Sequence, residues 1–363
     1  MRAAVLLSAG ISVGACFAQG AETTAASRIT AGWEYDDNVL EQSSGKTDGG
    51  AGTVSLFSRV RHLGSGDRSL NSQLDFQVGY KAHHRLADSA SLTAGDVLVN
   101  RVGIGASKRL SRLWTAGLSG ELKNRSIFRR NDLNLLSEEG YTRGSARFSA
   151  SRSLDPSTSL TLGYRYSFIN YENYHSFNFR SHSPRIGLSR KFGLRLRGSV
   201  QYSVTRRSYR RPVSAPSVPE GLVQLDRRQR DNLHQCDLAL TYGRGFVLNF
   251  IYTLQRNSSN NFGFSYWNNR LSLVFGKRLP GELFLNAYLF FELRRYSDKT
   301  DEPIMVDVIT EENDNNGGVL KLSRALAPGL EASLTFSHYR NQSSIRDLNF
   351  HKNLLNFALT HRF

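Results

Sequence analysis

The stretch Leu70–Lys81, LNSQLDFQVGYK, changes character at every second residue. Leu74, Phe76, Val78 and Tyr80 are apolar or aromatic, and the residues between them are polar, charged or glycine. Alternate side chains of an extended chain point to opposite faces, so one face would be apolar and the other polar. The stretch therefore predicts a β-strand whose two faces meet different surroundings.

The same period of two recurs along the chain. Trp114–Lys123, Leu160–Phe168 and Leu194–Val204 repeat it over about ten residues each, whereas strands in soluble sheets usually have about five or six. Sixteen such strands are predicted. They begin near Ile29, Thr53, Leu70, Leu98, Leu113, Tyr141, Ser159, Phe177, Leu194, Asn232, Phe246, Tyr266, Leu283, Gly318, Leu330 and Phe350.

The links between these strands alternate between short and long. Tight turns are predicted at Ser111–Arg112, Asp155–Ser157, Phe192–Gly193, Gly243–Gly245, Leu279–Gly281 and Ala327–Gly329. Long polar links are predicted at Asp36–Gly52, His83–Gly95, Arg125–Gly140, Arg206–Arg230, Gln255–Ser265 and Tyr296–Gly317. This alternation is typical of transmembrane barrels, in which about ten residues tilted near 45° span about 23 to 25 Å. We predict an all-β fold, a single closed antiparallel transmembrane β-barrel of about 16 strands (range about 14 to 18), with short periplasmic turns and long extracellular loops.

A secreted β-sandwich is the alternative fold, since its strands also alternate apolar with polar residues. A sandwich does not need strands of this length or loops sorted by length, and it hides its aromatic residues in a thin core. Here Trp114, Phe192, Phe246 and Phe363 lie close to short turns or to the final residue. An aromatic girdle at a membrane interface would occupy such positions, which favours the barrel.

The first residues predict export. Met1-Arg2 is followed by the apolar run Ala3–Val13 and by small residues up to Ala18, as in a signal peptide. We expect a signal peptide over residues 1–18, a short periplasmic segment over residues 19–27 and the barrel over residues 28–363. As an alternative, Val13–Cys16 approximates a lipoprotein signal, in which Cys16 would be lipidated. Under the first reading Cys236 is the one cysteine left, so an intramolecular disulfide is not expected.

The chain is strongly basic, with 47 Lys and Arg residues against 31 Asp and Glu residues. Nucleic acid is the usual partner of so basic a soluble protein. The predicted export argues against that partner, so we expect no nucleic acid to be bound. The mean hydropathy of −0.40 agrees with a barrel, because lipid contacts only every second residue of each strand.

The last residues, NFALTHRF, place Leu355, Phe357, Leu359 and Phe363 on one face. They resemble the C-terminal signal of Gram-negative outer-membrane proteins, although His361 departs from the usual apolar residue. The resemblance implies that the barrel-assembly machinery recognises these four residues and that the protein resides in the cell outer membrane.

The segment Gly32–Val39, GWEYDDNV, resembles the "YDDNV" opening of β-barrel porins associated with exopolysaccharide export. This resemblance implies a barrel and a link to saccharide export. Asp36, Asp37 and Asn38 also suit a turn that ends the first strand. A cation or ligand site at these residues is the alternative.

With the apolar residues facing lipid, the alternate residues face the lumen. The basic residues predicted to line the pore are Arg101, Lys123, Arg147, Arg165, Arg185, Arg195, Arg197, Arg270, Arg294 and Lys321. The main acidic residues on the same face are Asp75, Asp237, Glu292 and Glu331. A barrel of this size encloses an aqueous channel unless loops fill it, and a basic wall would concentrate anions.

We therefore expect a porin-like channel that passes anionic small solutes or acidic saccharide chains by passive diffusion. A non-conducting structural or exopolysaccharide-assembly barrel, in which the arginines only stiffen the wall, is the first alternative. An outer-membrane hydrolase is the second. The sequence holds no Gly-x-Ser-x-Gly, no His-Glu-x-x-His and no Cys/His cluster with metal spacing, so we expect no enzyme, cofactor or metal.

Two further clusters lie in predicted outer loops. Arg206–Arg211 and Arg227–Arg230 would bring basic side chains near outer-membrane lipid and lipopolysaccharide phosphates. Asp298–Asn316 is acidic but lacks the ordered spacing of an EF-hand, so a solvated loop is expected there.

Overall fold

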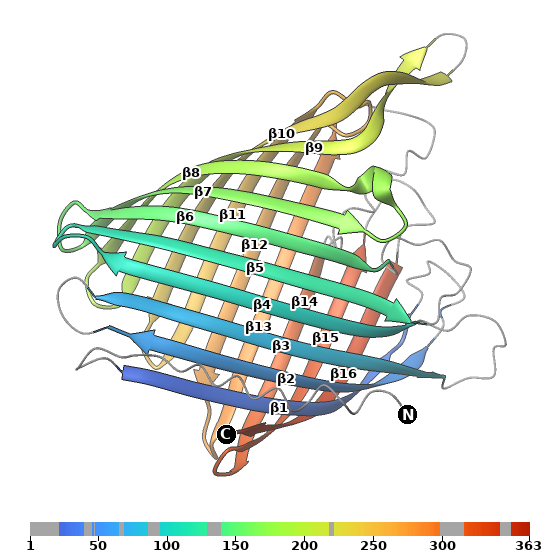
Figure 1. The fold of residues 1–363 in the computed structure, drawn as a ribbon. Coiled ribbons are helices and arrows are strands. Elements are labelled where there is room, and N and C mark those ends of the chain that lie inside the picture. The colour runs from blue at the N-terminus through green and yellow to red at the C-terminus, as the bar shows by residue number, and fades with distance from the viewer. Residues whose placement is uncertain are drawn as a thin grey trace.

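The protein is a closed barrel of antiparallel strands in which each strand pairs with its sequence neighbours and β1 pairs with β16 (Figure 1). The computed structural model describes residues 22–39, 46, 48–64, 69–85, 95–128, 139–217, 221–297, 316–341 and 350–363. The strands are β1 (Glu22–Asp36), β2 (Gly49–Leu63), β3 (Leu70–Arg85), β4 (Asp96–Arg109), β5 (Trp114–Phe128), β6 (Tyr141–Ser153), β7 (Thr158–Tyr171), β8 (Phe179–Phe192), β9 (Leu196–Ser217), β10 (Gly221–Gly243), β11 (Phe246–Ser259), β12 (Tyr266–Arg278), β13 (Leu283–Tyr296), β14 (Asn316–Ala327), β15 (Leu330–Asn341) and β16 (Phe350–Arg362).

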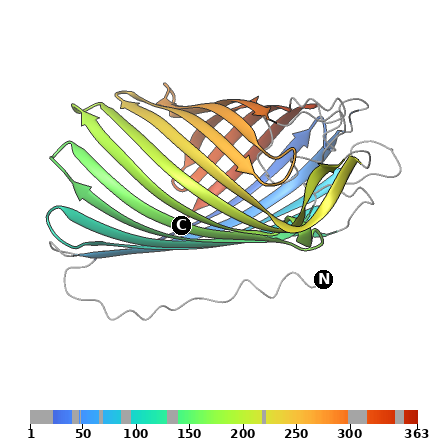
Figure 2. The same ribbon diagram turned by 90° about the horizontal axis from the view of Figure 1, so that it is seen from above.

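The predicted fold class is confirmed, including the number of sixteen strands. A short 3₁₀ turn, η2 (His175–Phe177), follows β7. No helix in the described ranges is long and apolar enough to cross a membrane. Figure 2 shows the strands as two facing walls, one from β1 to β8 in blue to green and the other from β10 to β16 in yellow to red.

The start of the barrel differs from the prediction. Strand β1 begins at Glu22 and pairs with β2 from Glu22 opposite Leu63 onward. Residues 22–27, expected in a periplasmic segment, are therefore strand. They were missed because this stretch is small and polar on both faces, so it lacks the alternation that marks the later strands. The predicted signal peptide and Cys16 lie outside the described residues.

The two ends of the barrel differ in their connections. The short links after β2, β4, β6, β8, β10, β12 and β14 lie at one end, here called the turn end, together with Glu22 and Phe363. Positive φ angles at Gly245 and Gly281 close two of these turns in a conformation that L side chains rarely adopt. The other links lie at the opposite end, here called the loop end.

One predicted loop is a pair of strands. The predicted longest outer loop covers residues 206–230. Its described residues 206–217 and 221–230 continue β9 and β10 as an antiparallel hairpin that reaches past its neighbours at the loop end (Figure 1). The pairing passes two register shifts between Leu225 and Arg230. Polar residues on both faces and three prolines concealed these strands, because beyond the hydrocarbon core no lipid chains select an apolar face.

The outward face of the barrel is apolar over its middle. Ile104, Leu118 and Phe148 are 57%, 58% and 53% exposed, and similar residues follow on every strand. So continuous an apolar surface is unfavourable in water but matches the hydrocarbon core of a bilayer. The residues between them therefore face inward, and the buried cluster of Tyr141, Ile169 and Tyr171 lies inside at the loop end.

The closing seam joins β1 to β16. Its loop-end half is held by the residues of the YDDNV segment: Asp37 accepts hydrogen bonds from the backbone N and the Nδ2 of Asn353 at 2.7 and 2.6 Å. Asp36 pairs with Lys352 at 3.0 Å and accepts the backbone N–H of Asn38. These contacts describe a strand-ending turn that ties the first strand to the last. Among the described residues, no group of three or more His, Cys, Asp or Glu side chains could hold a metal ion.

Candidate functional site: the inward face

The predicted pore-lining residues alternate with exposed apolar residues, which places nine of the ten on the inward face. They are Arg101, Lys123, Arg147, Arg165, Arg185, Arg197, Arg270, Arg294 and Lys321. Arg195 lies in the turn between β8 and β9, because β9 begins only at Leu196. Arg197 lies near the turn end and donates to the Ser189 hydroxyl at 3.3 Å.

Several of these basic residues are neutralised by carboxylates. Arg101 donates to Glu121 on the adjacent strand at 2.5 Å. Glu331 pairs with both Lys321 and Arg362, at 3.9 and 2.5 Å. Such pairs connect neighbouring strands and lower the net positive charge at their positions.

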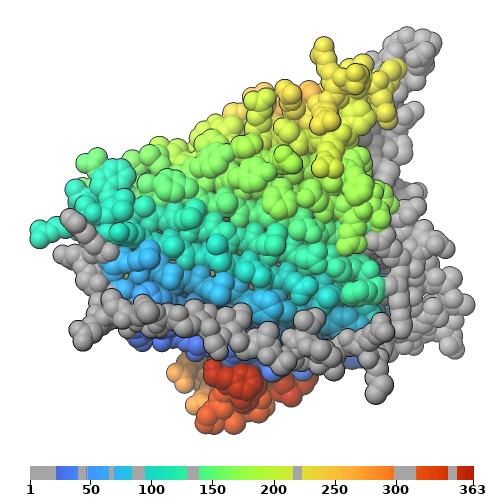
Figure 3. All heavy atoms as spheres, viewed as in Figure 1, coloured from blue at the N-terminus to red at the C-terminus, as the bar shows by residue number. Residues whose placement is uncertain are grey.

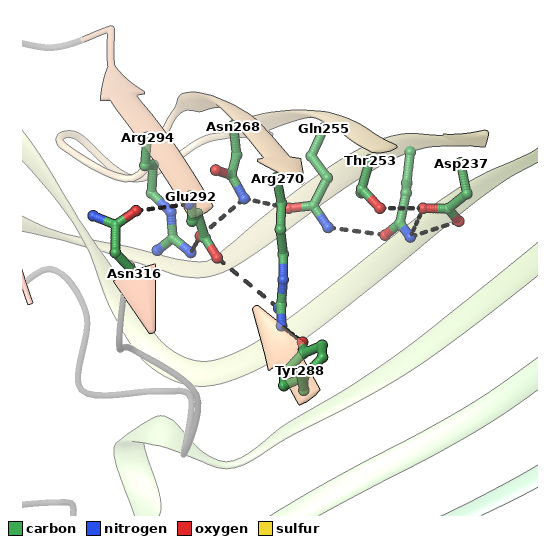
Figure 4. Close-up of polar contacts among 10 residues, drawn as sticks. Asp237, Thr253, Gln255, Asn268, Arg270, Tyr288, Glu292, Arg294 and Asn316 are labelled. Carbon is green, nitrogen blue, oxygen red and sulfur yellow. Dashed lines mark hydrogen bonds and ion pairs between the residues drawn. The ribbon is translucent and has the colours of Figure 1, made fainter. Parts of the chain in front are cut away.

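A polar network covers the inward face of β10 to β13 (Figure 4). Its centre is Glu292, whose side chain is 4% exposed and pairs with Arg294 at 2.8 Å and Arg270 at 4.0 Å. Asn268 donates to the same carboxylate at 2.9 Å and to Gln255 at 3.0 Å. Arg270 and Arg294 thus share the charge of a buried carboxylate. This agrees with the alternative in which inward arginines only stiffen the barrel wall.

The network continues sideways to a second carboxylate. Gln255 donates to Gln235 at 2.9 Å, and Gln235 donates to Asp237 at 2.9 and 2.8 Å. The Thr253 hydroxyl also donates to Asp237, at 2.6 Å. Each hydrogen bond joins side chains of adjacent positions, so this part of the wall is held in one arrangement.

A different arrangement is found on β6, β7 and β8. Arg147 and Arg165 are direct partners in the β6–β7 register, and Arg185 lies opposite Gly163, two residues from Arg165. Arg143 lies on the same face, four residues before Arg147, and joins them. These residues, Arg143, Arg147, Arg165 and Arg185, are here called the arginine cluster.

Among the residues that the structure describes, no carboxylate pairs with the arginine cluster. Arg143, Arg147 and Arg185 all lie close enough to Arg165 to repel it. Glu121 is also within electrostatic range, but its hydrogen bond goes to Arg101. Within the described ranges, none of the four arginines forms an ion pair, and the Nε atoms of Arg165 and Arg185 are buried without a hydrogen-bond partner.

Gly163 determines where Arg185 lies. A Cβ built at Gly163 would meet the Nε of Arg185 and its Cγ at 2.9 Å. The guanidinium therefore lies across the bare backbone of β7, in a place that another residue would fill. The sequence LGYRY alternates glycine and arginine on one face and so contains the signal for this arrangement.

Lys123 completes the basic arc beside the cluster. It lies opposite Arg143 in the register and its Nζ is 5.3 Å from the centre of the Tyr141 ring. Arg143 is the member that the prediction missed. Its spacing of four residues from Arg147, in YTRGSAR, places both side chains on one face of a strand and would have identified it.

Basic residues of the hairpin divide between the two faces. Arg211 is 8% exposed and its guanidinium lies 4.1, 5.0 and 5.1 Å from the ring centres of Phe264, Tyr209 and Phe177. Its Nε donates to the buried Gln229. Arg211 therefore holds the base of the hairpin together and is not available to a solute.

No family model matches the sequence, and no curated protein is significantly similar to it. Solved structures resemble it in fold. Outer-membrane expressed OmpT of Vibrio cholerae has a TM-score of 0.50 at 9% identity, with 96% of this chain and 99% of that chain covered. OccAB4 of Acinetobacter baumannii has a TM-score of 0.47 at 10% identity, covering 94% and 98%. A bacterial polysaccharide outer membrane secretin has a TM-score of 0.42 at 12% identity, covering 93% and 98%.

The chain is thus a barrel of the outer-membrane kind. Its closed sheet leaves no unpaired edge, its middle is apolar outside, and its fold is that of the outer-membrane protein OmpT. The predicted location in the outer membrane is confirmed. In such barrels short turns face the periplasm and longer loops face the exterior, so the turn end is periplasmic and the loop end is extracellular.

Proposed function

We propose that the protein is a porin-like channel whose basic inner face favours anions, either small solutes or acidic saccharide chains, which cross by passive diffusion. The observation that carries the proposal is the arginine cluster, because no carboxylate in the described part of the chain forms an ion pair with it. The proposed role is transport and not catalysis.

Uncompensated charge in a narrow aqueous pore determines which ions enter. Rings or walls of arginine raise the local potential, concentrate anions and repel cations. An arginine also presents a planar fork of N–H groups that fits carboxylate and phosphate oxygens. Passing anions would satisfy in turn the donors that Arg165 and Arg185 leave without partners.

A purely structural role accounts for the paired residues but not for the cluster. Arg270 and Arg294 join their strands through Glu292, and Arg101 does so through Glu121. The cluster instead brings like charges together, which costs stability. Groups that are kept despite a loss of stability commonly belong to a ligand-binding site.

The choice of an acidic saccharide as one cargo rests on the resemblance of Gly32–Val39 to porins associated with exopolysaccharide export. A saccharide chain bearing carboxylates would meet the arginines at successive sugar units. A small anion would use the same side chains one at a time, so both cargos follow from the same charge.

Planar-bilayer conductance tests the proposal. The refolded chain is inserted between solutions of unequal KCl concentration, and the reversal potential is measured. We expect a reversal potential whose sign shows selectivity for chloride over potassium. In the variant R147Q/R165Q/R185Q this potential should shift markedly toward zero. The control R152Q/R190Q/R324Q removes equal charge from the outward face at the turn end and should leave the reversal potential unchanged. A cation-selective or silent protein would overturn the proposal.

A further inference from the structure

A second group of unpaired arginines lies on the outside of the barrel at the loop end. Its members share the outward face of β8 to β13 and are exposed. They are Arg180, Arg206, Arg210, Arg228, Arg230, Arg256 and Arg295, here called the outer arginine belt. None of them forms an ion pair with another residue that the structure describes. Figure 3 shows the hairpin carrying part of the belt, in yellow, projecting beyond the wall.

The belt is ordered by strand register. Arg180 on β8 lies opposite Ser208 on β9, which lies opposite Arg230 on β10. In the next row, Arg206 lies between His182 and Asn232. Strands are about 4.8 Å apart, so Arg180 and Arg230 originate about 10 Å apart with a hydroxyl between them.

The belt begins where the apolar band ends. Arg206 is ten residues beyond Leu196, the first residue of β9, and Arg256 is ten residues beyond Phe246, the first residue of β11. A tilted strand of about ten residues crosses about 23 Å, which is close to the height of the apolar band. Arg206 and Arg256 therefore lie at the level of the lipid headgroups of the outer leaflet, and the other members lie at this level or beyond it.

Aromatic and histidine side chains mark the same boundary, beside or just below the innermost arginines of the belt. The hydroxyl of Tyr164 bonds to the Nδ1 of His182 at 2.6 Å, and that of Tyr202 bonds to the Nδ1 of His234 at 2.7 Å. Trp267 lies under Arg256, whose Cζ is 5.2 Å from the ring centre. Amphipathic rings collect at the membrane interface, which supports the assigned level.

The belt occupies one side of the barrel. On the described part of β1 to β4, the outward tyrosines near the loop end donate instead to acids, Tyr35 to Asp48 and Tyr80 to Asp96. Within the hairpin, Arg207 and Arg211 turn inward, whereas Arg206 and Arg210 point out. Among the described residues of the hairpin, Asp226 is the exposed acid near Arg228, so the described side chains of the belt carry an excess of positive charge.

We propose that the outer arginine belt binds the phosphate groups of the phosphorylated glycolipid in the outer leaflet. Guanidinium groups bind phosphate oxygens through paired, charge-assisted hydrogen bonds. Their position at headgroup level favours a lipid-anchored phosphate, whose acyl chains pack against the apolar band below. The inference needs only the outer-membrane location, and it is independent of conduction.

Affinity for lipid A tests the inference. The full chain, refolded in detergent, is titrated with diphosphoryl lipid A, and bound lipid is counted by native mass spectrometry. We expect R180Q/R206Q/R230Q to bind at least tenfold more weakly than the unaltered chain. The control R152Q/R190Q/R324Q, equal in charge loss but at the turn end, should bind within about twofold. Heat-modifiable electrophoretic mobility shows that each variant is folded.

Lipid A without phosphates distinguishes phosphate recognition from acyl-chain packing, and the unaltered chain should bind it as weakly as the belt variant binds the phosphorylated form. Inorganic pyrophosphate should compete only at concentrations far above those of lipid A. Equal binding by all variants, equal loss in the control, or competition by pyrophosphate at lipid A concentrations would each overturn the inference.

Discussion

Arg147 and Arg165 lie directly opposite one another across the β6–β7 pair, and neither forms an ion pair with a described carboxylate. Two positive side chains in register repel each other, whereas most basic residues elsewhere on the inner face meet an acid.

Removing one charge from the arginine cluster should stabilise the barrel. In R165Q the repulsion from Arg143, Arg147 and Arg185 is relieved, and we expect a free energy of unfolding higher by about 1 kcal/mol. Urea unfolding in detergent measures it. Anion selectivity should fall in the same variant.

The matched control for that change is R59Q. Arg59 donates to Asp75 at 2.8 and 3.2 Å, so its loss leaves a carboxylate without its partner and should destabilise. If R165Q and R59Q lower the free energy of unfolding equally, the arginine cluster stabilises the barrel, which contradicts the prediction.

Filling the space beside Arg185 should alter conduction without altering charge. G163A places a Cβ where the Arg185 guanidinium now lies, so this side chain must move away from β7. We expect a changed single-channel conductance with the sign of the reversal potential retained. G105A is the control, because nothing lies within 4 Å of a Cβ at Gly105. Identical effects of both changes would contradict the placement of Arg185.

We expect the loss of the Glu292 carboxylate to lower the free energy of unfolding strongly, because this side chain is buried between two arginines. E292Q keeps the volume but removes the buried carboxylate that pairs with Arg270 and Arg294, and the expected loss is about 3 kcal/mol. Anion selectivity should rise, since one negative charge is removed from beside these two arginines. E331Q is the control: its side chain is 21% exposed, so its loss should be smaller. A larger loss in E331Q would contradict the central role of Glu292.

The closing seam should weaken in acid. Burial would raise the pKa of Asp37, but hydrogen bonds from Asn353 and the charge of Lys46 outweigh it and hold the pKa below the ordinary value of 3.8. A carboxyl with a lowered pKa contributes stability above its ordinary pKa, and that stability is lost as the pH falls through the folded value. We therefore expect stability to drop below about pH 4, and D37N to show a flatter pH profile. Parallel profiles for the two proteins would contradict this role of Asp37.

Phe363 should matter to assembly in cells more than to stability. It is 69% exposed at the turn end, and its backbone N donates to Ser27 at 2.9 Å, a contact that any residue can make. F363S should reduce the amount of barrel in the outer membrane, measured by heat-modifiable mobility of the membrane fraction, while refolding in detergent stays efficient. F336S, which alters an aromatic residue exposed on β15, is the control. Equal defects in both variants would contradict recognition of Phe363 by the assembly machinery.

The strand order could be predicted from the sequence because the membrane imposes its pattern directly. Leu70, Tyr141, Phe246 and Phe350 were predicted as first residues of strands, and the structure begins strands at each of them. Lipid selects an apolar residue at every second position, so the signal is local. Where β9 and β10 leave the membrane this selection ends, and the hairpin was predicted to be a loop.

The inward direction of the basic residues followed from the same alternation, but their pairing did not. Arg101 lies opposite Lys123 but donates diagonally to Glu121, whereas Arg147 lies opposite Arg165. In the sequence both arginines occupy equivalent polar positions. Which residue lies opposite depends on the register between two strands. Register arises from turn lengths and packing across the whole sheet, so charge compensation required the three-dimensional structure.

The seam between β1 and β16 also sets the order in which this barrel can be completed. The contact between Asp37 and Asn353 joins residues 316 positions apart, and closing so long a chain costs about 5 kcal/mol of entropy for a free chain. Hairpins between consecutive strands form at far smaller cost, so we expect the sheet to grow strand by strand and to close last. Until that step, β1 and β16 each expose an unpaired strand edge to apolar surroundings. The contacts of Asp36, Asp37 and Asn38 with β16 would then form last and hold the closed barrel together.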